Sequence, residues 1–281
     1  SQALQRFYLW GGLQIASNAF RLLLLGIILL LGVTSPFSAL IIFALPSLVI
    51  FILSWLWFDK RILTTRPTMQ NFREFWQFSR WTAGFSIISS IVSRLDMLLA
   101  GRYLDLREVG SYSLAVTMVM FLPQLASAIG TVTATKFASF SDIPHARLYL
   151  RKATIFSTTV SLGVAALMIP AAVLVILFTG QEYTAAFTPF LILLVSLIVF
   201  IAGNPLRDYL LYFTKRPQLF FWANLGQGIV LLLSGRLIIP RLGSNGISIT
   251  VLLSHIFLGL FCLLYYLKIS GANEDHSSGP S

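Results

Sequence analysis

Two charged residues lie inside a stretch of this chain that is otherwise apolar. Arg94 and Asp96 follow residues 81–93, none of which is charged. As a helix, the thirteen residues 81–93 span only ~20 Å, less than the ~30 Å hydrocarbon layer of a bilayer. Charges inside a membrane are rare and commonly belong to a substrate or ion pathway. The pair therefore predicts a polar site or pathway inside the membrane.

Two further positions have the same character. Arg21 precedes the uncharged residues 22–33, which span only ~18 Å as a helix. Arg207 and Asp208 follow Asn204-Pro205 near the end of another apolar stretch, where the proline predicts a local kink. A second interpretation stays open for each arginine. In this interpretation the Arg21 side chain extends to the membrane interface, and Arg207 is an ordinary basic anchor beside that interface.

Small polar side chains recur at helical spacing around these charges. Arg94 and Asp96 are two positions apart, about 200° around a helix, which excludes a simple ion pair one turn apart. Spacings of three and four residues place on one helix face Thr82, Ser86, Ser89, Ser93 and Asp96. The next apolar stretch holds a similar series of Ser113, Thr117, Met120, Gln124, Ser127 and Thr131. Either the two series line a hydrated cavity, or their small residues allow close helix packing.

The elements that carry these residues are predicted to be membrane-spanning helices. The chain is 57% hydrophobic and only 11% charged, whereas soluble domains carry about 25% charged residues. Roughly 20 apolar residues form one crossing, and the alternation typical of membrane strands is absent. The sequence predicts an all-α integral membrane protein with about eight transmembrane helices, at residues 9–33, 37–58, 76–101, 110–135, 151–178, 185–213, 218–239 and 247–268.

The distribution of basic residues predicts the orientation. With the N-terminus inside and eight crossings, both termini are cytoplasmic, and the outer side carries only four basic residues, Arg102, Arg107, Arg236 and Arg241. The inner side carries Arg6, Lys60, Arg61, Arg66, Arg73, Arg80, Lys136, Arg147, Arg151, Lys152, Lys215, Arg216 and Lys268. This excess follows the positive-inside rule, so the net charge of +10 needs no nucleic-acid partner.

The longest interruption between predicted helices marks a domain boundary. Residues 59–75 are basic, include Pro67 and are predicted to form a cytoplasmic linker. They separate residues 1–58, with two helices, from residues 76–268, with six. Residues 269–281 are polar and rich in serine and glycine, and we predict a disordered tail.

No catalytic arrangement is indicated. Cys262 is the only cysteine, so the sequence predicts neither a disulfide framework nor a cysteine metal site. It has no Ser-His-Asp arrangement, Cys/His cluster or phosphate-binding glycine loop. We therefore expect no enzyme, no cofactor and no metal. His255 is interpreted as a packed polar residue, and Gly226 and Gly228 as helix packing points.

Three stretches resemble the polysaccharide (oligosaccharide-lipid) flippases of the MOP superfamily, relatives of the MATE drug exporters and the lipid II flippases. Residues 94–101 (RLDMLLAG) and 109–115 (VGSYSLA) are similar to the family pattern RxDxxLLG…VGxYxLA, with Ala100 as an extra residue. Residues 178–186 (FTGQEYTAA) are similar to FGxEYxxA. Residues 239–248 (IPRLGSNGIS) are similar to IPxxGxxGAA, with Ile247-Ser248 in place of the small pair.

The resemblance implies two six-helix lobes around a cationic cavity, and transport by alternating access. Residues 76–268 would form the whole MATE/MOP-like C-terminal lobe. Residues 1–58 would be the last two helices of an incomplete N-terminal lobe, so an N-terminally truncated member is expected. The implied substrate is a polyprenyl-diphosphate-linked oligosaccharide, a unit of lipopolysaccharide O-antigen, capsule or exopolysaccharide, moved from the inner to the outer leaflet of a bacterial plasma membrane. The residues expected to bind it are Arg94, Asp96, Arg21, Arg207 and Gln124.

Other hypotheses stay open. A MATE-like small-molecule exporter would favour an acidic, aromatic cavity. An inactive or partner-dependent half-transporter would follow from an incomplete first lobe. A glycosyltransferase, ligase or polymerase of the same pathway would need a large outer loop, and the predicted outer loops are short. The expected partners are the lipid-linked substrate, the bilayer, and a polysaccharide polymerase and glycosyltransferase.

Overall fold

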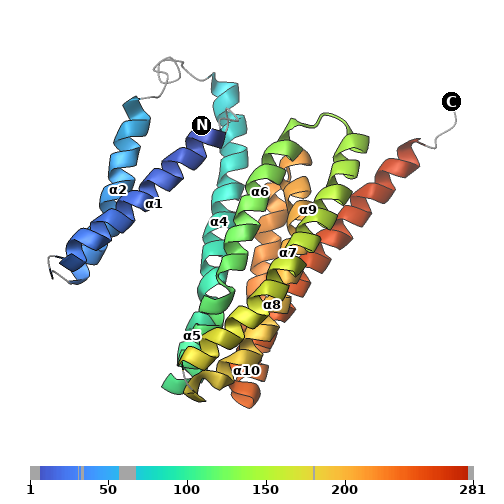
Figure 1. Ribbon diagram of the computed structural model, residues 1–281. Coiled ribbons are helices and arrows are strands. Elements are labelled where there is room, and N and C mark those ends of the chain that lie inside the picture. Colours follow the sequence, from blue (N-terminus) through green and yellow to red (C-terminus); the bar gives the residue numbers. More distant parts are fainter. Residues whose placement is uncertain (1–6, 31, 33–34, 57–67, 180, 278–281) are drawn as a thin grey trace. The chain divides into compact units, whose positions relative to one another are not determined.

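The computed structural model describes residues 7–30, 32, 35–56, 68–179 and 181–277, and all regular structure in them is helical (Figure 1). The predicted all-α class is confirmed for this part of the chain. The elements are α1 (Phe7–Leu30), α2 (Pro36–Leu56), α4 (Met69–Tyr103), α5 (Leu106–Val119), α6 (Phe121–Ser139), α7 (Ile143–Thr179), the 3₁₀ helix η1 (Gln181–Ala186), α8 (Phe187–Ala202), α9 (Asn204–Asp208), the π-helix η2 (Tyr209–Phe213) and α10 (Pro217–Ser277).

Several of these helices are long and apolar enough to cross a membrane. Six such stretches occur in the described residues, at Gly11–Ile28, Ser79–Tyr103, Leu106–Ser139, Ile143–Phe178, Tyr183–Phe213 and Pro217–Ser270. The last stretch belongs to α10, which is broken at Gly243 and so forms two arms, residues 217–242 and 244–277. The chain is therefore an integral membrane protein, while the count of eight crossings stays a prediction.

Large apolar side chains face outward along these helices. Leu167, Leu177 and Phe178 of α7 are 73%, 72% and 91% exposed, and Leu237 and Leu264 of α10 are similarly open. In water, such a surface would drive aggregation. In hydrocarbon it has no such cost, so the exposed leucines agree with a lipid-facing surface.

The chain divides into two compact units, residues 1–72 and 73–281. In the first unit α1 packs against α2. Residues 57–67, which include most of the predicted linker, lie outside the described residues. The remainder of that linker differs from the prediction, because α4 begins at Met69. At the other end, α10 runs to Ser277, beyond the predicted helix end at Lys268.

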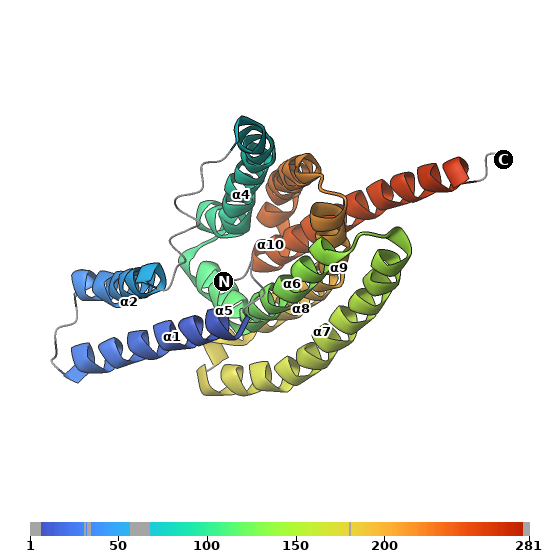
Figure 2. The ribbon, with the colours of Figure 1, turned by 90° about the horizontal axis from the view of Figure 1, so that it is seen from above.

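Within the second unit, α8 is the element around which several others pack. It contacts α5, α7 and α10. Helix α7 also packs against α6 and α9, and in the view from above it curves along one side of this unit (Figure 2). Helix α4 packs against the first arm of α10. Trp81 and Phe221 meet edge to face with ring centroids 5.6 Å apart.

Local sequence determines where these helices begin and break. Asp105 caps α5 by accepting the Glu108 N–H at 2.7 Å, an arrangement that satisfies a free helix-terminal donor. The kink predicted at Pro205 is confirmed, since α8 ends at Ala202 and α9 begins at Asn204. Pro123 likewise lacks the N–H that would donate one turn back, and α5 and α6 are separated at Met120.

The break within α10 depends on two glycines. Gly243 has φ 56° and ψ −134°, a conformation that side-chain-bearing residues rarely adopt. A Cβ at Gly246 would lie 2.9 Å from the Ile238 carbonyl oxygen, so the returning chain passes too close for any side chain. Both glycines belong to the stretch 239–248 in which the sequence shows the third family pattern.

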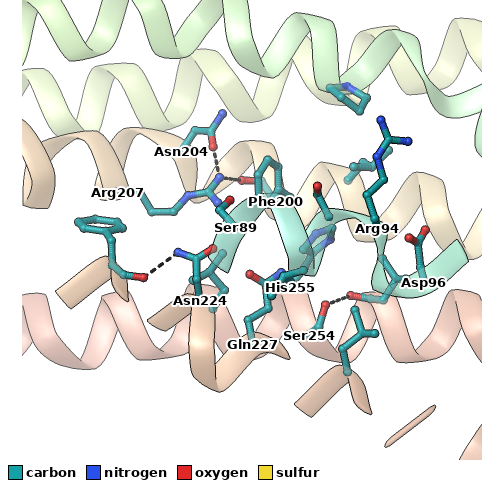
Figure 3. Close-up of a pocket in the computed structure, with 18 of the residues that line it drawn as sticks. Ser89, Arg94, Asp96, Phe200, Asn204, Arg207, Asn224, Gln227, Ser254 and His255 are labelled. Atoms are coloured by element: carbon teal, nitrogen blue, oxygen red, sulfur yellow. Dashed lines mark hydrogen bonds between the residues drawn. The ribbon is translucent and has the colours of Figure 1, made fainter. Parts of the chain in front are cut away.

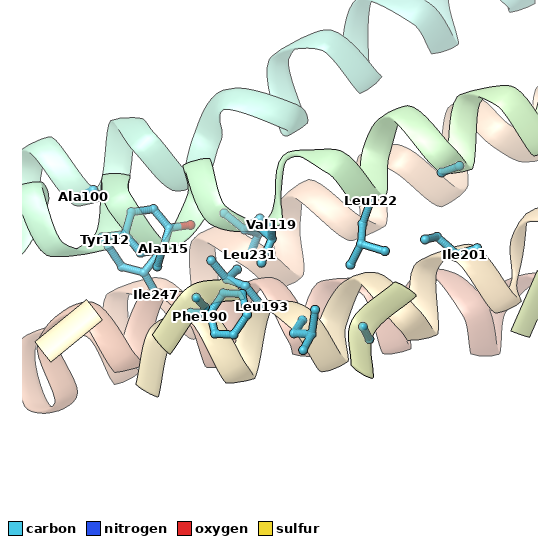
Figure 4. Close-up of a cluster of buried hydrophobic side chains, with 14 of the residues drawn as sticks. Ala100, Tyr112, Ala115, Val119, Leu122, Phe190, Leu193, Ile201, Leu231 and Ile247 are labelled. Carbon is cyan, nitrogen blue, oxygen red and sulfur yellow. The ribbon is translucent and has the colours of Figure 1, made fainter. Parts of the chain in front are cut away.

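Apolar side chains fill the interior between these helices. Fully buried residues of α5, α6 and α8 form the main cluster, including Tyr112, Leu122, Phe190 and Ile201 (Figure 4). Gly226 and Gly228 are packing points as predicted. A Cβ at Gly226 would lie 2.8 Å from the Phe257 ring, and one at Gly228 would lie 2.9 Å from Val92.

Candidate functional site

A cavity of about 710 Å³ lies within the second unit. Its wall is built by α4, α5, α6, α8, α9, η2 and both arms of α10. Ligand pockets commonly measure about 300–1,000 Å³, so this volume can hold a small polar ligand or one segment of a larger one. Four of the five residues expected from the sequence line it: Arg94, Asp96, Gln124 and Arg207.

Arg94 and Asp96 both reach the cavity although they lie on different faces of α4. The Asp96 carboxylate is half-buried and accepts a hydrogen bond of 2.8 Å from the Tyr112 hydroxyl of α5. Arg94 is exposed, and within the described residues its guanidinium has no hydrogen bond or ion pair. The acid is therefore held by the fold, whereas the guanidinium donors are free for a ligand.

Arg207 has the opposite surroundings. Its guanidinium donates to the Phe200 carbonyl oxygen at 2.8 Å and to the Asn204 side-chain oxygen. Its Cζ also lies 3.8 Å from the centroid of the Phe200 ring, in cation–π contact. Figure 3 shows Arg207 and Arg94 toward opposite ends of the cavity. Arg207 is thus tied to the break between α8 and α9.

Asp208 lies beside Arg207 and is also engaged. Its carboxylate accepts a hydrogen bond from the Thr133 hydroxyl of α6. Directly after it, η2 has the wider π-helical turn, with the Thr214 N–H donating to the Tyr209 carbonyl at 3.2 Å. Such turns commonly accompany functional sites in membrane and soluble helices. The part of the cavity wall formed by α9 and η2 is therefore irregular backbone that polar side chains stabilise.

Of the two remaining expected residues, Gln124 and Arg21, only Gln124 lines the cavity. Gln124 lies on the cavity wall in α6. Arg21 belongs to the first unit, where it is half-buried and donates to the Ser47 hydroxyl of α2 at 3.3 Å. It is not among the residues that line the cavity.

The two series of small polar residues differ in how many of their members line the cavity. Ser89, Ser93 and Asp96 of the first series line the cavity. In the second series only Met120 and Gln124 do so, while the Thr117 and Thr131 hydroxyls donate to carbonyls of their own helix. Three of the five residues of the first series thus line the cavity, against two of the six residues of the second series.

Sequence reasoning missed a neutral polar wall on α10. Asn224 and Gln227 line the cavity from residues 217–242, and Ser254 and His255 line it from residues 244–277. His255 is packed, as predicted, with Nδ1 2.7 Å from the Ser196 hydroxyl, but it also reaches the cavity. The available signal was the pair of amides one helical turn apart in a segment without any charge.

Comparison with known proteins gives a family match. A family described as polysaccharide biosynthesis protein matches residues 5–188, about two thirds of the 281 residues. The match includes the first two of the three stretches singled out above, and with them Arg94, Asp96 and Gln124. No curated protein and no solved structure matches the chain.

Proposed function

The chain belongs to the polysaccharide biosynthesis protein family, and from this membership we propose that it is a flippase. It moves a polyprenyl-diphosphate-linked oligosaccharide from the inner to the outer leaflet of a bacterial plasma membrane. The observation that carries the proposal is Arg94, a guanidinium without a protein partner among the described residues, on the wall of a cavity inside an apolar helical unit.

Moving a diphosphate through hydrocarbon is costly. The charged group cannot cross unaided, so a carrier must replace its hydration with donors of its own. Arg94 offers a planar fork of N–H groups that matches phosphate oxygens. Asp96, two residues away, forms no ion pair with this cation among the described residues, and its carboxylate accepts the Tyr112 hydroxyl instead. Arg94 is therefore the proposed diphosphate ligand, with Gln124 beside it on the cavity wall.

Alternating access requires helices that can change direction near the substrate. Discontinuous helices around a central site are typical of secondary transporters. In the second unit, helical breaks occur at Met120 and Gly203, next to the cavity-lining residues Gln124 and Asn204. We propose that these breaks are the hinges of the transport movement.

The test is a flipping assay in proteoliposomes. The substrate is a lipid-linked oligosaccharide that carries a fluorophore on its sugar, and an added membrane-impermeant quencher reports how much has changed leaflet. The wild-type protein should equilibrate the substrate, and Arg94→Ala should slow this strongly. Arg102→Ala is the matched control, because Arg102 is an exposed arginine of the same helix that does not line the cavity.

The same assay tests the wider set of expected residues. The double variant Arg94→Ala, Arg21→Ala should lose transport. Full transport by that variant would exclude both arginines as substrate ligands. If the protein moved a cationic dye and left the lipid-linked glycan in place, a MATE-like exporter would replace the flippase.

The remaining parts of the proposal concern topology and partners. We propose that residues 76–268 act as the C-terminal lobe and that both termini are cytoplasmic. A polysaccharide polymerase and the glycosyltransferases of the pathway are the proposed partners. Accessibility of cysteines introduced singly at Arg102 and Lys136 to an impermeant thiol reagent, in a Cys262→Ser background, checks this orientation. Labelling from outside should reach position 102 and leave position 136 unlabelled.

A further inference from the structure

The part of the cavity between Arg207 and Arg94 carries uncharged polar side chains that face into it (Figure 3). Asn224 and Gln227 lie one helical turn apart on the first arm of α10 and are only 7% and 6% exposed. Both side chains are thus more than nine-tenths buried and still line the cavity. Buried amides of this kind are normally hydrogen-bonded, because leaving them without a partner is costly.

The hydrogen bonds of these amides are incomplete within the protein. Asn224 donates through Nδ2 to the Phe220 carbonyl at 2.8 Å, and its side-chain oxygen accepts no hydrogen bond from the described residues. Gln227 has no hydrogen bond to any described residue. A carboxamide has two donors and an acceptor oxygen, so this pair presents both kinds of group to whatever fills the cavity.

An imidazole from the second arm of α10 completes this wall. His255 is fixed at Nδ1 by the buried Ser196 hydroxyl at 2.7 Å, which leaves its second ring nitrogen without a partner among the described residues. The Phe200 ring contacts His255, with centroids 4.8 Å apart, and also the Arg207 guanidinium. Arg207 is therefore held by the protein at Nη2, and the side chains of Asn224 and Gln227 that lie between the two arginines are uncharged.

We propose that Asn224, Gln227 and His255 form a subsite for an uncharged sugar ring, next to the diphosphate ligand Arg94. The inference rests on the proposed function and specifies the part of the substrate that this wall recognises. Sugar hydroxyls donate and accept at once, which matches carboxamide and imidazole groups. An acidic sugar fits poorly, because the carboxylates of Asp96 and Asp208 lie on the same cavity and repel a third carboxylate.

The experiment compares short lipid ligands that differ only in the sugar. The affinity of the purified full chain is measured for farnesyl diphosphate, for farnesyl-diphospho-N-acetylglucosamine and for the glucuronic acid analogue. The neutral sugar should tighten binding by about three- to tenfold over the bare diphosphate, the gain expected of one or two hydrogen bonds. The acidic sugar should give no gain.

The variant Gln227→Met keeps the side-chain volume and removes the amide. It should abolish the gain from the neutral sugar and leave the affinity for farnesyl diphosphate unchanged. Gln218→Met is the matched control, because Gln218 is exposed on the same helix and does not line the cavity. Asn224→Leu is the second variant, and melting temperatures identify any variant that fails to fold.

The outcomes separate this inference from the proposed function. A gain from the neutral sugar that persists in Gln227→Met and Asn224→Leu overturns the subsite, and so does tight binding of farnesyl diphosphate with no gain from either sugar. Both results leave the flippase proposal standing. If none of the three lipids binds, the flippase proposal fails, and binding of methyl N-acetylglucosaminide then tests the subsite alone. If the wild-type protein binds this sugar and Gln227→Met does not, the subsite is supported. If the wild-type protein does not bind it, the subsite is overturned.

Discussion

Arg94 and Arg207 line one cavity, but only Arg207 has protein partners among the described residues. Arg207 has a carbonyl, an amide oxygen and an aromatic ring around its guanidinium, whereas Arg94 has no such partner in the described residues. An unpaired charge away from water is costly, so a cation becomes part of the fold when the protein pairs it. Two arginines of one membrane cavity can therefore have different roles. An engaged arginine should affect stability, and a free one should affect ligand binding.

The largest effect is expected from removing the engaged arginine. Arg207→Leu deletes the hydrogen bonds to Phe200 and Asn204 together with the contact to the Phe200 ring. The free energy of unfolding should fall by about 2–4 kcal/mol, because the two acceptors lose a charged donor. Denaturant titration of the detergent-solubilised protein measures this.

Arg94→Leu is the matched substitution at the other end of the cavity. Since Arg94 is exposed and has no described partner, its replacement should change the unfolding free energy by less than about 0.5 kcal/mol. Equal destabilisation by the two leucine variants would remove the distinction between the arginines.

Ligand binding should reverse this order. Arg94→Ala should weaken binding of farnesyl diphosphate about ten- to a hundredfold, the worth of one charge-assisted hydrogen bond. Arg94→Lys should recover part of the loss, because lysine keeps the charge but not the planar fork. Isothermal titration of the purified protein gives these affinities. Undiminished binding by Arg94→Ala would assign the diphosphate to another cation.

The helices were largely predictable from the sequence, because uninterrupted apolar stretches have few alternatives in a membrane. The break at Pro205 followed from the missing N–H of proline. The start of α4 could not be predicted from hydropathy, because the helix begins at Met69 inside a basic, polar segment. The local sequence signal for this start is Pro67-Thr68, directly before the helix.

The site was only partly predictable, for a different reason. Charges such as Arg94 are conspicuous in an apolar sequence. Asn224 and Gln227 are neutral, and their role becomes visible only when the other helices of the second unit enclose them. Sequence spacing also could not show that Asp96 bonds to Tyr112 of the next helix, or that Phe200 is the partner of Arg207. Those contacts are tertiary, and no local pattern specifies them.

The two aspartates of the cavity extend the comparison at smaller scale. Both are engaged, Asp96 by Tyr112 and Asp208 by Thr133. Tyr112→Phe should lower the unfolding free energy by about 1–2 kcal/mol, because it leaves a half-buried carboxylate without its donor. Tyr103→Phe, at an exposed tyrosine of α4, is the control and should have no measurable effect. If Asp96→Asn made Tyr112→Phe no less harmful, the hydrogen bond would not be the cause.

The smallest effect is expected outside the membrane-spanning stretches, at the start of α7. Asp142 accepts the backbone N–H of His145 at 3.2 Å and a hydrogen bond from its ring, and the latter holds the pKa of Asp142 below its usual value. A carboxyl whose pKa is lowered by folding stabilises the protein above its unfolded pKa, near 4. That contribution disappears as the pH falls through the lower folded value. Wild type should therefore lose stability relative to Asp142→Asn as the pH falls below about 4. The free energy of unfolding measured across this range checks the prediction, and a difference that stays constant at acid pH would show that folding does not lower the pKa of Asp142.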